Sequence, residues 1–175
     1  MTQPLLYLRH GQTDGNLQNL CVGQMDLPLN ALGTKQAQRA AQSPLLQQIT
    51  AIISSPLSRA VKTAGHVSHT TGLPVQFHDG LKECGMGVWE GLPEDDPKMY
   101  DRWIAGETPD GAESWHMFSS RVRRSVVEIM QFHEHPLIVA HCAVLWAIRD
   151  GLGLTTDNEL GNGAFATLKI PQGFS

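Results

Sequence analysis

An arginine and a histidine directly follow a short apolar run near the start of the chain: Leu5-Leu6-Tyr7-Leu8 leads into Arg9-His10-Gly11. The run predicts a buried parallel strand that opens into a loop, and open α/β sheets build their active sites at such strand ends. A neutral imidazole nitrogen can attack an electrophile, while an arginine fork matches two oxygens of a phosphate or carboxylate. The alternative for so short a motif is a structural histidine beside a surface arginine.

Three further segments carry residues suited to the same chemistry. Ala51-Ile52-Ile53 precedes a stretch in which Pro56 is suited to begin a helix, so Arg59 is expected in the first turns of that helix. The apolar run from Pro136 to Ala140 ends at His141. The glycine-broken segment 81–91 carries Glu83 and Glu90, and a loop carboxylate can protonate a leaving group. On composition alone, either glutamate is a candidate acid.

Taken in this order, the motifs resemble the histidine phosphatase superfamily, in its phosphoglycerate mutase-like branch, over nearly the whole chain. Arg9-His10-Gly11 with Thr13 and Asn16 is similar to the first signature of the family, and residues 23–37 are similar to the segment that follows it. Arg59, Glu83 and His141 fall where the family places its second arginine, its acid and its second histidine. The resemblance favours Glu83 over Glu90, because Trp-Glu-Gly follows the acid in the family pattern.

The chain departs from the family pattern after the second histidine. Glycine is common there, whereas this chain has Cys142-Ala143, whose side chains would either narrow the phosphate pocket or offer an oxidisable thiol. Asn30 takes the place of a frequent threonine, and the last motif, Asn162 to Phe165, is a close match. Neither of these two changes touches the implied chemistry.

The resemblance implies phosphoryl transfer without a metal or another cofactor. Arg9, Arg59 and His141 would supply positive charge around the phosphate, while His10 attacks phosphorus in line to give a phosphohistidine. Glu83 would protonate the leaving alkoxide and later take a proton from the hydrolytic water, so burial and a dianionic phosphate should raise its pKa.

Substrate-side contacts are expected from Thr13, Asn16 and Cys142. For Thr13 and Asn16 the alternative is local turn bonding. Tyr100, Arg102 and Trp103, in a segment over the site, are expected to select among substrates.

A phosphatase is favoured over a mutase because family mutases have a longer segment between the acid and the second histidine. Only 57 residues lie between Glu83 and His141, and no arginine pair precedes Arg121 in that gap. The prediction is therefore a monophosphatase that acts on a small phosphorylated metabolite. The alternatives are a phosphoglycerate mutase-type phosphotransferase, a protein phosphohistidine phosphatase and a catalytically silent module that binds a phospho-ligand.

Composition is consistent with one ordinary globular domain over residues 1–175. The chain has 41% hydrophobic residues and a net charge of −4 without a basic run, which argues against nucleic acid as a partner. Three cysteines form neither a metal spacing nor a complete disulfide framework, which favours a reducing cytoplasm. No apolar stretch is long enough to cross a membrane. Oligomeric state stays open.

Alternating strands and helices predict a three-layer α/β fold, with a mostly parallel sheet covered by helices on both faces, as in phosphoglycerate mutase-like proteins. Residues 84–112 are expected to form a small cap with one short helix at 99–104. The expected strands are 5–8, 51–54, 75–77, 137–140 and 164–170, and the other expected helices are 31–40 behind an Asn30 cap, 56–69, 113–132 and 143–150.

For several other features we favour a structural or surface role over a functional one. His133-Glu134-His135 sits at a helix end, where cationic side chains suit the helix dipole better than a metal role. His66 and His69 are expected at the surface, and Trp89 and Trp146 are expected to pack in the interior. A short basic patch, formed by Arg121, Arg123 and Arg124, is expected to be solvated.

Overall fold

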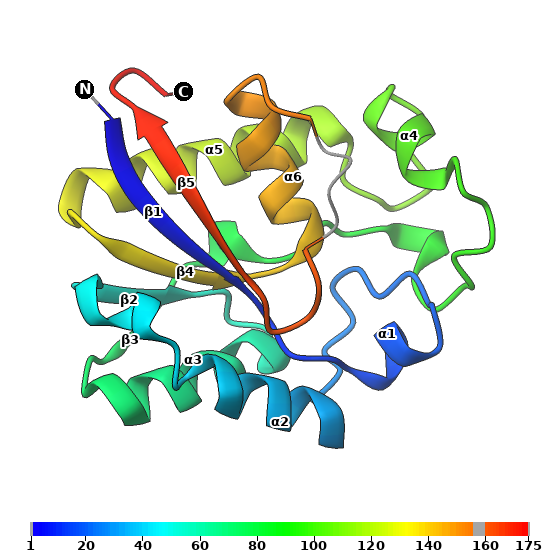
Figure 1. Ribbon diagram of the computed structural model, residues 1–175. Helices are drawn as coiled ribbons and strands as arrows, with labels where there is room; N and C mark the ends of the chain where they lie inside the picture. Colours follow the sequence, from blue (N-terminus) through cyan, green and yellow to red (C-terminus); the bar gives the residue numbers. More distant parts are fainter. Residues whose placement is uncertain (1, 156–159, 175) are drawn as a thin grey trace.

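Five strands form one sheet in the order β3-β2-β4-β1-β5 (Figure 1). The computed structural model describes residues 2–155 and 160–174. The strands are β1 (Thr2–Arg9), β2 (Ala51–Ser54), β3 (Val75–Phe77), β4 (Pro136–Ala140) and β5 (Phe165–Pro171). All neighbours are parallel except β1 and β5, which pair antiparallel from Thr2↔Pro171 to Leu8↔Phe165. The mostly parallel sheet predicted from the short apolar runs is confirmed.

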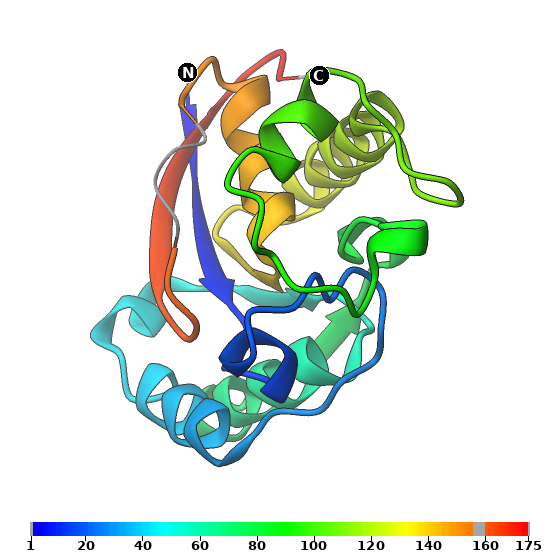
Figure 2. The same cartoon turned by 90° about the vertical axis from the view of Figure 1, so that its right-hand side faces the viewer.

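Helices cover both faces of the sheet, as Figures 1 and 2 show from two sides. One face packs against α5 (Trp115–Phe132) and α6 (Cys142–Gly151), with a core that includes Tyr7, Ile138 and Val126. The other face packs against α2 (Ala31–Ala40) and α3 (Ser58–Thr71), around Leu8 and Val139. Alternate residues of β1 and β4 thus serve opposite cores, as a two-sided strand requires. The three-layer α/β prediction is confirmed.

The remaining elements are short. They are α1 (Asp14–Leu17), α4 (Met99–Ile104) and three 3₁₀ turns, η1 (Pro44–Gln48), η2 (Asp79–Leu81) and η3 (Gly87–Trp89). α4 lies against α5, where Trp103 packs edge-on to Trp115 at 5.1 Å between ring centroids. Segment 84–112 therefore contains the short helix that was predicted. No helix of the described residues is long and apolar enough to cross a membrane.

Helix boundaries differ from the predicted ones by one or two residues, and the capping groups account for where α3 and α5 begin. α3 begins at Ser58 rather than at Pro56, since the Ser58 amide donates to the Asp26 carboxylate at 2.7 Å. α5 begins at Trp115, one residue after Ser114, whose hydroxyl caps it by accepting from the Met117 amide. The predicted Asn30 cap of α2 is confirmed by a 2.8 Å bond from the Gly33 amide.

Candidate active site

The two histidines predicted at strand ends lie side by side. β1 and β4 are parallel neighbours with Arg9 paired to Ala140, so His10 and His141 follow their strands at the same edge of the sheet. The His10 amide donates to the Ala140 carbonyl at 3.0 Å, and the two imidazole centroids are 5.1 Å apart. Strand pairing thus brings together two rings that are far apart in sequence.

The hydrogen bonds of His10 leave one ring nitrogen unprotonated. Nδ1 lies 2.7 Å from the Gly11 carbonyl oxygen, and because a carbonyl can only accept, Nδ1 carries the proton. The lone pair is therefore on Nε2. Burial, together with the charges of Arg59 and Arg9, lowers the pKa of His10 well below its ordinary value. At neutral pH this ring is a neutral imidazole with a nucleophilic lone pair on Nε2 rather than a cation.

Two arginines line the cavity beside His10, and each is fixed by backbone carbonyls. Arg59 donates from Nη1 to Met25 at 2.7 Å and from Nη2 to Gly23 at 2.9 Å, where Gly23 adopts a left-handed φ of 51°. Arg9 donates from Nη1 to Leu160 at 2.6 Å. The Nε atoms of both arginines are buried and have no hydrogen-bond partner among residues 2–155 and 160–174. Because an unpartnered buried donor is costly, these N–H groups suit an anionic ligand.

His141 is fully buried against His10. Its Nε2 lies 2.8 Å from the Ser55 hydroxyl oxygen, which also accepts from the Leu57 amide. Nδ1 has no partner in the described part of the chain, so it can donate to a ligand when it carries a proton. Burial, followed by the charges of Arg59 and the neighbouring His10, lowers the pKa of His141. The lowered pKa favours a neutral ring, and the role of His141 as a source of positive charge beside a phosphate stays a prediction.

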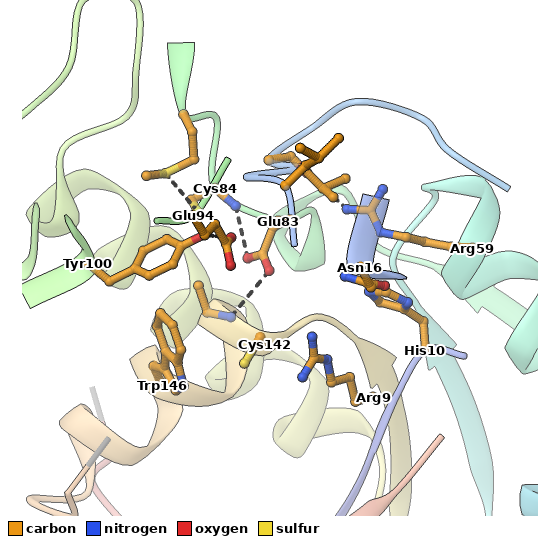
Figure 3. A pocket seen from close by; sticks show the side chains of 15 residues that line it. Arg9, His10, Asn16, Arg59, Glu83, Cys84, Glu94, Tyr100, Cys142 and Trp146 are labelled. Carbon is orange, nitrogen blue, oxygen red and sulfur yellow. Dashed lines mark hydrogen bonds between the residues drawn. The ribbon is translucent and has the colours of Figure 1, made fainter. Parts of the chain in front are cut away.

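Glu83 lies across the cavity from His10, as Figure 3 shows. Its Oε1 accepts from the Cys84 amide at 3.1 Å, and its Oε2 accepts from the Ala143 amide at 3.2 Å in the first turn of α6. Burial raises the pKa of Glu83, while Arg59 and the two amide bonds oppose that rise. The net direction is the one predicted for a proton donor.

Arg121 fixes the backbone that carries Glu83. It donates to the carbonyls of Gly80 and Lys82, both at 3.0 Å, and forms a two-nitrogen contact with Glu113 at 3.0 and 2.6 Å. The expectation of a solvated Arg121 was wrong, because on α5 this side chain points toward the η2 loop rather than into water. Of the other two arginines in the predicted patch, Arg124 is exposed and Arg123 is half-buried.

The rival carboxylate, Glu90, has a different place. Its Oε1 accepts from the amides of Gln24 at 2.9 Å and Met86 at 3.1 Å, and Glu90 is not among the residues that line the cavity. It joins the loop before α2 to the loop after Glu83. This position matches the choice of Glu83 as the candidate acid.

Thr13 and Asn16 differ in their access to the cavity. Thr13 is fully buried and caps α1 in a reciprocal capping box with Asn16, which is the local bonding given as the alternative. Asn16 also lines the cavity, and its Oδ1 accepts from Asn162 at 3.3 Å. Asn162 in turn donates to the His10 carbonyl at 3.1 Å. Sequence reasoning missed this link, since nothing in the last motif indicates a contact with the first.

The cavity has two adjoining parts. The inner pocket, of about 60 Å³, contains His10, Arg59, Glu83 and Ala143, and the outer pocket, of about 270 Å³, contains Asn19, Gly161 and Asn162. Seven residues line both pockets: Arg9, Asn16, Leu20, Glu94, Tyr100, Cys142 and Trp146. The inner pocket accommodates a small group next to His10, and the outer pocket accommodates what is attached to it.

Cap residues divide between the cavity and the interior. Tyr100 faces the cavity as predicted, and its ring meets Trp146 edge-on at 5.3 Å between centroids. Arg102 and Trp103 were also expected to select among substrates, but neither lines the cavity. Arg102 forms salt bridges with Asp96 and Glu107 at the surface. Trp103 is fully buried, and its indole N–H donates to the Glu113 carbonyl. Trp146 both packs against the core and lines the cavity, and Trp89 packs against the core.

Cys142, the departure noted after His141, lines both pockets and is half-buried. Figure 3 places it between Trp146 and Arg9. The other two cysteines, Cys21 and Cys84, are buried, and burial raises the pKa of Cys21 to about 11. Among the described residues, no group of three or more His, Cys, Asp or Glu side chains is arranged to hold a metal ion.

Comparison with known proteins agrees with this arrangement. Residues 5–169 match the model of the histidine phosphatase superfamily (branch 1). The chain is 33% identical to the adenosylcobalamin/alpha-ribazole phosphatase of Escherichia coli, over 95% of this chain and 94% of that protein. It is 37% identical over 147 residues to a bifunctional protein of Mycobacterium tuberculosis, which the chain matches over only 40% of that protein's length.

A solved structure of a mycobacterial glucosyl-3-phosphoglycerate phosphatase in complex with VO3 superimposes with a TM-score of 0.84. The two chains are 32% identical, and the match covers 95% of this chain and 92% of the other.

Proposed function

Because the chain belongs to the histidine phosphatase superfamily, we propose that it hydrolyses phosphate monoesters through a phosphohistidine on His10, without a metal ion. One observation carries this proposal. Three of the four buried side-chain nitrogens that lack a partner in the described structure belong to Arg9 and Arg59, which line the cavity with His10, and to His141, whose ring centroid lies 5.1 Å from that of His10. Phosphate oxygens would satisfy all three donors at once.

In the first step, the lone pair on His10 Nε2 forms a bond to phosphorus while the P–O bond to the leaving group breaks. The hydrogen bond from Nδ1 to the Gly11 carbonyl stabilises the imidazole as positive charge develops on it. The arginine donors and His141 Nδ1 neutralise charge on the three equatorial oxygens. Glu83, with its raised pKa, transfers its proton to the leaving alkoxide.

In the second step, Glu83 accepts a proton from water as the water oxygen attacks phosphorus and the P–N bond breaks. Inorganic phosphate leaves, and both His10 and Glu83 return to their starting protonation states. The amides of Cys84 and Ala143 stabilise the carboxylate between the two steps, because they donate to its two oxygens.

The proposal extends to the organisation and setting of the chain. We infer one domain over residues 1–175, in which residues 84–112 act as a cap that carries Glu94 and Tyr100 to the cavity. A small phosphorylated metabolite is the proposed substrate, since the outer pocket is about 270 Å³. Cytoplasmic location is consistent with three cysteines that are not in disulfides.

The test is phosphate release from alkyl and aryl monophosphates in excess EDTA. Wild-type turnover should persist in EDTA and should vanish in His10→Ala. A matched control, His69→Ala, alters an exposed histidine on α3 and should retain wild-type rates. Turnover that survives in His10→Ala, or that EDTA abolishes, would overturn the proposal.

A further inference from the structure

We propose that Glu94 makes the outer pocket select monoesters whose leaving group is uncharged and bears hydroxyl groups, and reject those that carry a second anionic group. This inference rests on the proposed phosphatase function and names its substrate class. It follows from how Glu94 is held, from the charges of the two pockets and from the chemistry of the residues around them.

The backbone of Glu94 is fixed at the cavity wall. Its amide donates to the Asn19 carbonyl at 2.8 Å, and the Asn19 side-chain amide donates back to the Glu94 carbonyl at 2.9 Å. Asn19 adopts a left-handed φ of 54°, a conformation that asparagine tolerates better than most residues. An adjacent bridge joins Leu20 to Pro93. The loop that carries Glu94 is therefore anchored to the segment after α1.

The side chain of Glu94 is also oriented. The Tyr100 hydroxyl donates a hydrogen bond to its Oε1. Burial and the nearby carboxylate raise the pKa of Tyr100, so the phenol stays protonated and remains a donor. Figure 3 shows the Glu94 carboxylate beside Tyr100, on the side of the cavity where Glu83 lies. Because Glu94 lines both pockets, its charge acts on any group attached to the phosphate.

Positive charge in the cavity comes from two arginines: Arg59 lines only the inner pocket, and Arg9 lines both pockets. Arg9 and Arg59 are the only lysine or arginine residues among the described residues that line the two pockets. Both are needed for the phosphate, and Arg9 also bonds to the Leu160 carbonyl. A carboxylate or second phosphate in the outer pocket would face Glu94 and would have to compete with the reacting phosphate for Arg9. Burying an unpaired charge next to a like charge is strongly unfavourable.

Hydroxyl groups suit the remaining lining of the outer pocket. The Glu94 carboxylate and the amide oxygens of Asn19 and Asn162 are hydrogen-bond acceptors, which match hydroxyl donors. Tyr100 and Trp146 supply an aromatic wall for the carbon skeleton of such a group. The combination of acceptors with an apolar wall is typical of a site for a sugar or another polyol.

A pair of esters tests this selection with a single chemical change. Glycerol 3-phosphate and 3-phosphoglycerate differ by a hydroxymethyl group in place of a carboxylate. For like charges at about 5 Å in a partly shielded site, Coulomb repulsion predicts a kcat/KM roughly ten- to hundredfold higher for glycerol 3-phosphate. Glu94→Gln should reduce that ratio to about threefold or less. Asp95→Asn, which removes a charge at the next, exposed position, should leave the ratio unchanged.

Affinity measurements keep the result separate from the proposed function. Calorimetric binding of the same two esters to His10→Ala, and to His10→Ala combined with Glu94→Gln, tests the discrimination without turnover. Absence of turnover in the wild type would contradict the phosphatase proposal, and the binding ratio would still decide the role of Glu94. Preference for 3-phosphoglycerate, or a ratio that Glu94→Gln and Asp95→Asn affect equally, would overturn this inference.

Discussion

Replacing Glu83 by glutamine should slow the first turnover of an alkyl phosphate far more than that of nitrophenyl phosphate. An alkoxide needs a proton to leave, whereas nitrophenolate departs without one. General acid catalysis contributes roughly 10²- to 10⁴-fold to the rate. With the alkyl ester, Glu83→Gln should therefore raise the activation free energy by about 3 to 5 kcal/mol. With the aryl ester, the rate should fall by less than about tenfold. Rapid-quench measurement of the first turnover isolates this step from hydrolysis of the intermediate.

The structure also predicts that this substitution lowers the free energy of unfolding. Glu83 accepts one amide bond on each oxygen, from Cys84 and from Ala143. Glutamine keeps only one acceptor oxygen, so one backbone N–H loses its partner, at a cost of about 1–3 kcal/mol in the free energy of unfolding. Urea unfolding measures this loss independently of activity.

Glu90→Gln is the matched control for this experiment. Both of its amide bonds reach the same oxygen, Oε1, which glutamine can retain. This variant should show no dependence on the leaving group. Equal losses with both esters in Glu83→Gln, or a leaving-group dependence in Glu90→Gln, would refute the assignment of Glu83 as the acid.

Three further predictions concern the cations, the histidines and the thiol. Arg59→Lys should weaken inorganic phosphate binding by roughly tenfold or more, measured by calorimetry, because lysine cannot keep both carbonyl bonds and still present a planar fork. The free energy of unfolding should fall as pH decreases below about 6.5, measured by urea titration, because the pKa values of His10 and His141 are lowered in the folded chain. Cys142 should react with iodoacetamide faster than the buried Cys84, and phosphate should slow that reaction, as quantified by peptide mass spectrometry.

Each of these predictions has its own control. Lys62, which lies in the same helix, is exposed, so Lys62→Ala should leave phosphate affinity unchanged. Below pH 6.5 the histidines of the unfolded chain bind protons that His10 and His141 do not bind in the native state. The free energy of unfolding therefore falls by up to about 1.4 kcal/mol per pH unit for each ring. His141→Gln should reduce this slope. A flat pH dependence between 7 and 5, or alkylation of Cys142 that ignores phosphate, would count against the respective prediction.

The sequence predicted those parts of the site that lie at strand ends. Short apolar runs identified β1 and β4, and parallel pairing then required His10 and His141 to meet at one edge of the sheet. Arg59 was predictable for the same reason, since it lies in the first turn of the helix that follows β2. Local patterns carry this information because strand and helix periodicity are properties of neighbouring residues.

Residues that act through long-range side-chain contacts could not be predicted from local sequence patterns. Asp26 caps α3, Glu83 receives an amide of α6, and Arg121 holds the loop before Glu83. None of these contacts follows from local spacing, because each joins segments that only the tertiary fold brings together. Tyr100 and Trp103 are both aromatic residues of α4, and only packing determines that one faces the cavity and the other the core.

Trapping a phosphoryl group on His10 during turnover tests the proposed mechanism most directly. Wild type and Glu83→Gln would be mixed with nitrophenyl phosphate, quenched in alkali within milliseconds and analysed by peptide mass spectrometry. We expect one acid-labile phosphoryl group on His10, which accumulates further in Glu83→Gln because hydrolysis is slowed. Rapid turnover with no phosphoryl group on His10, or a label on another residue, would contradict it.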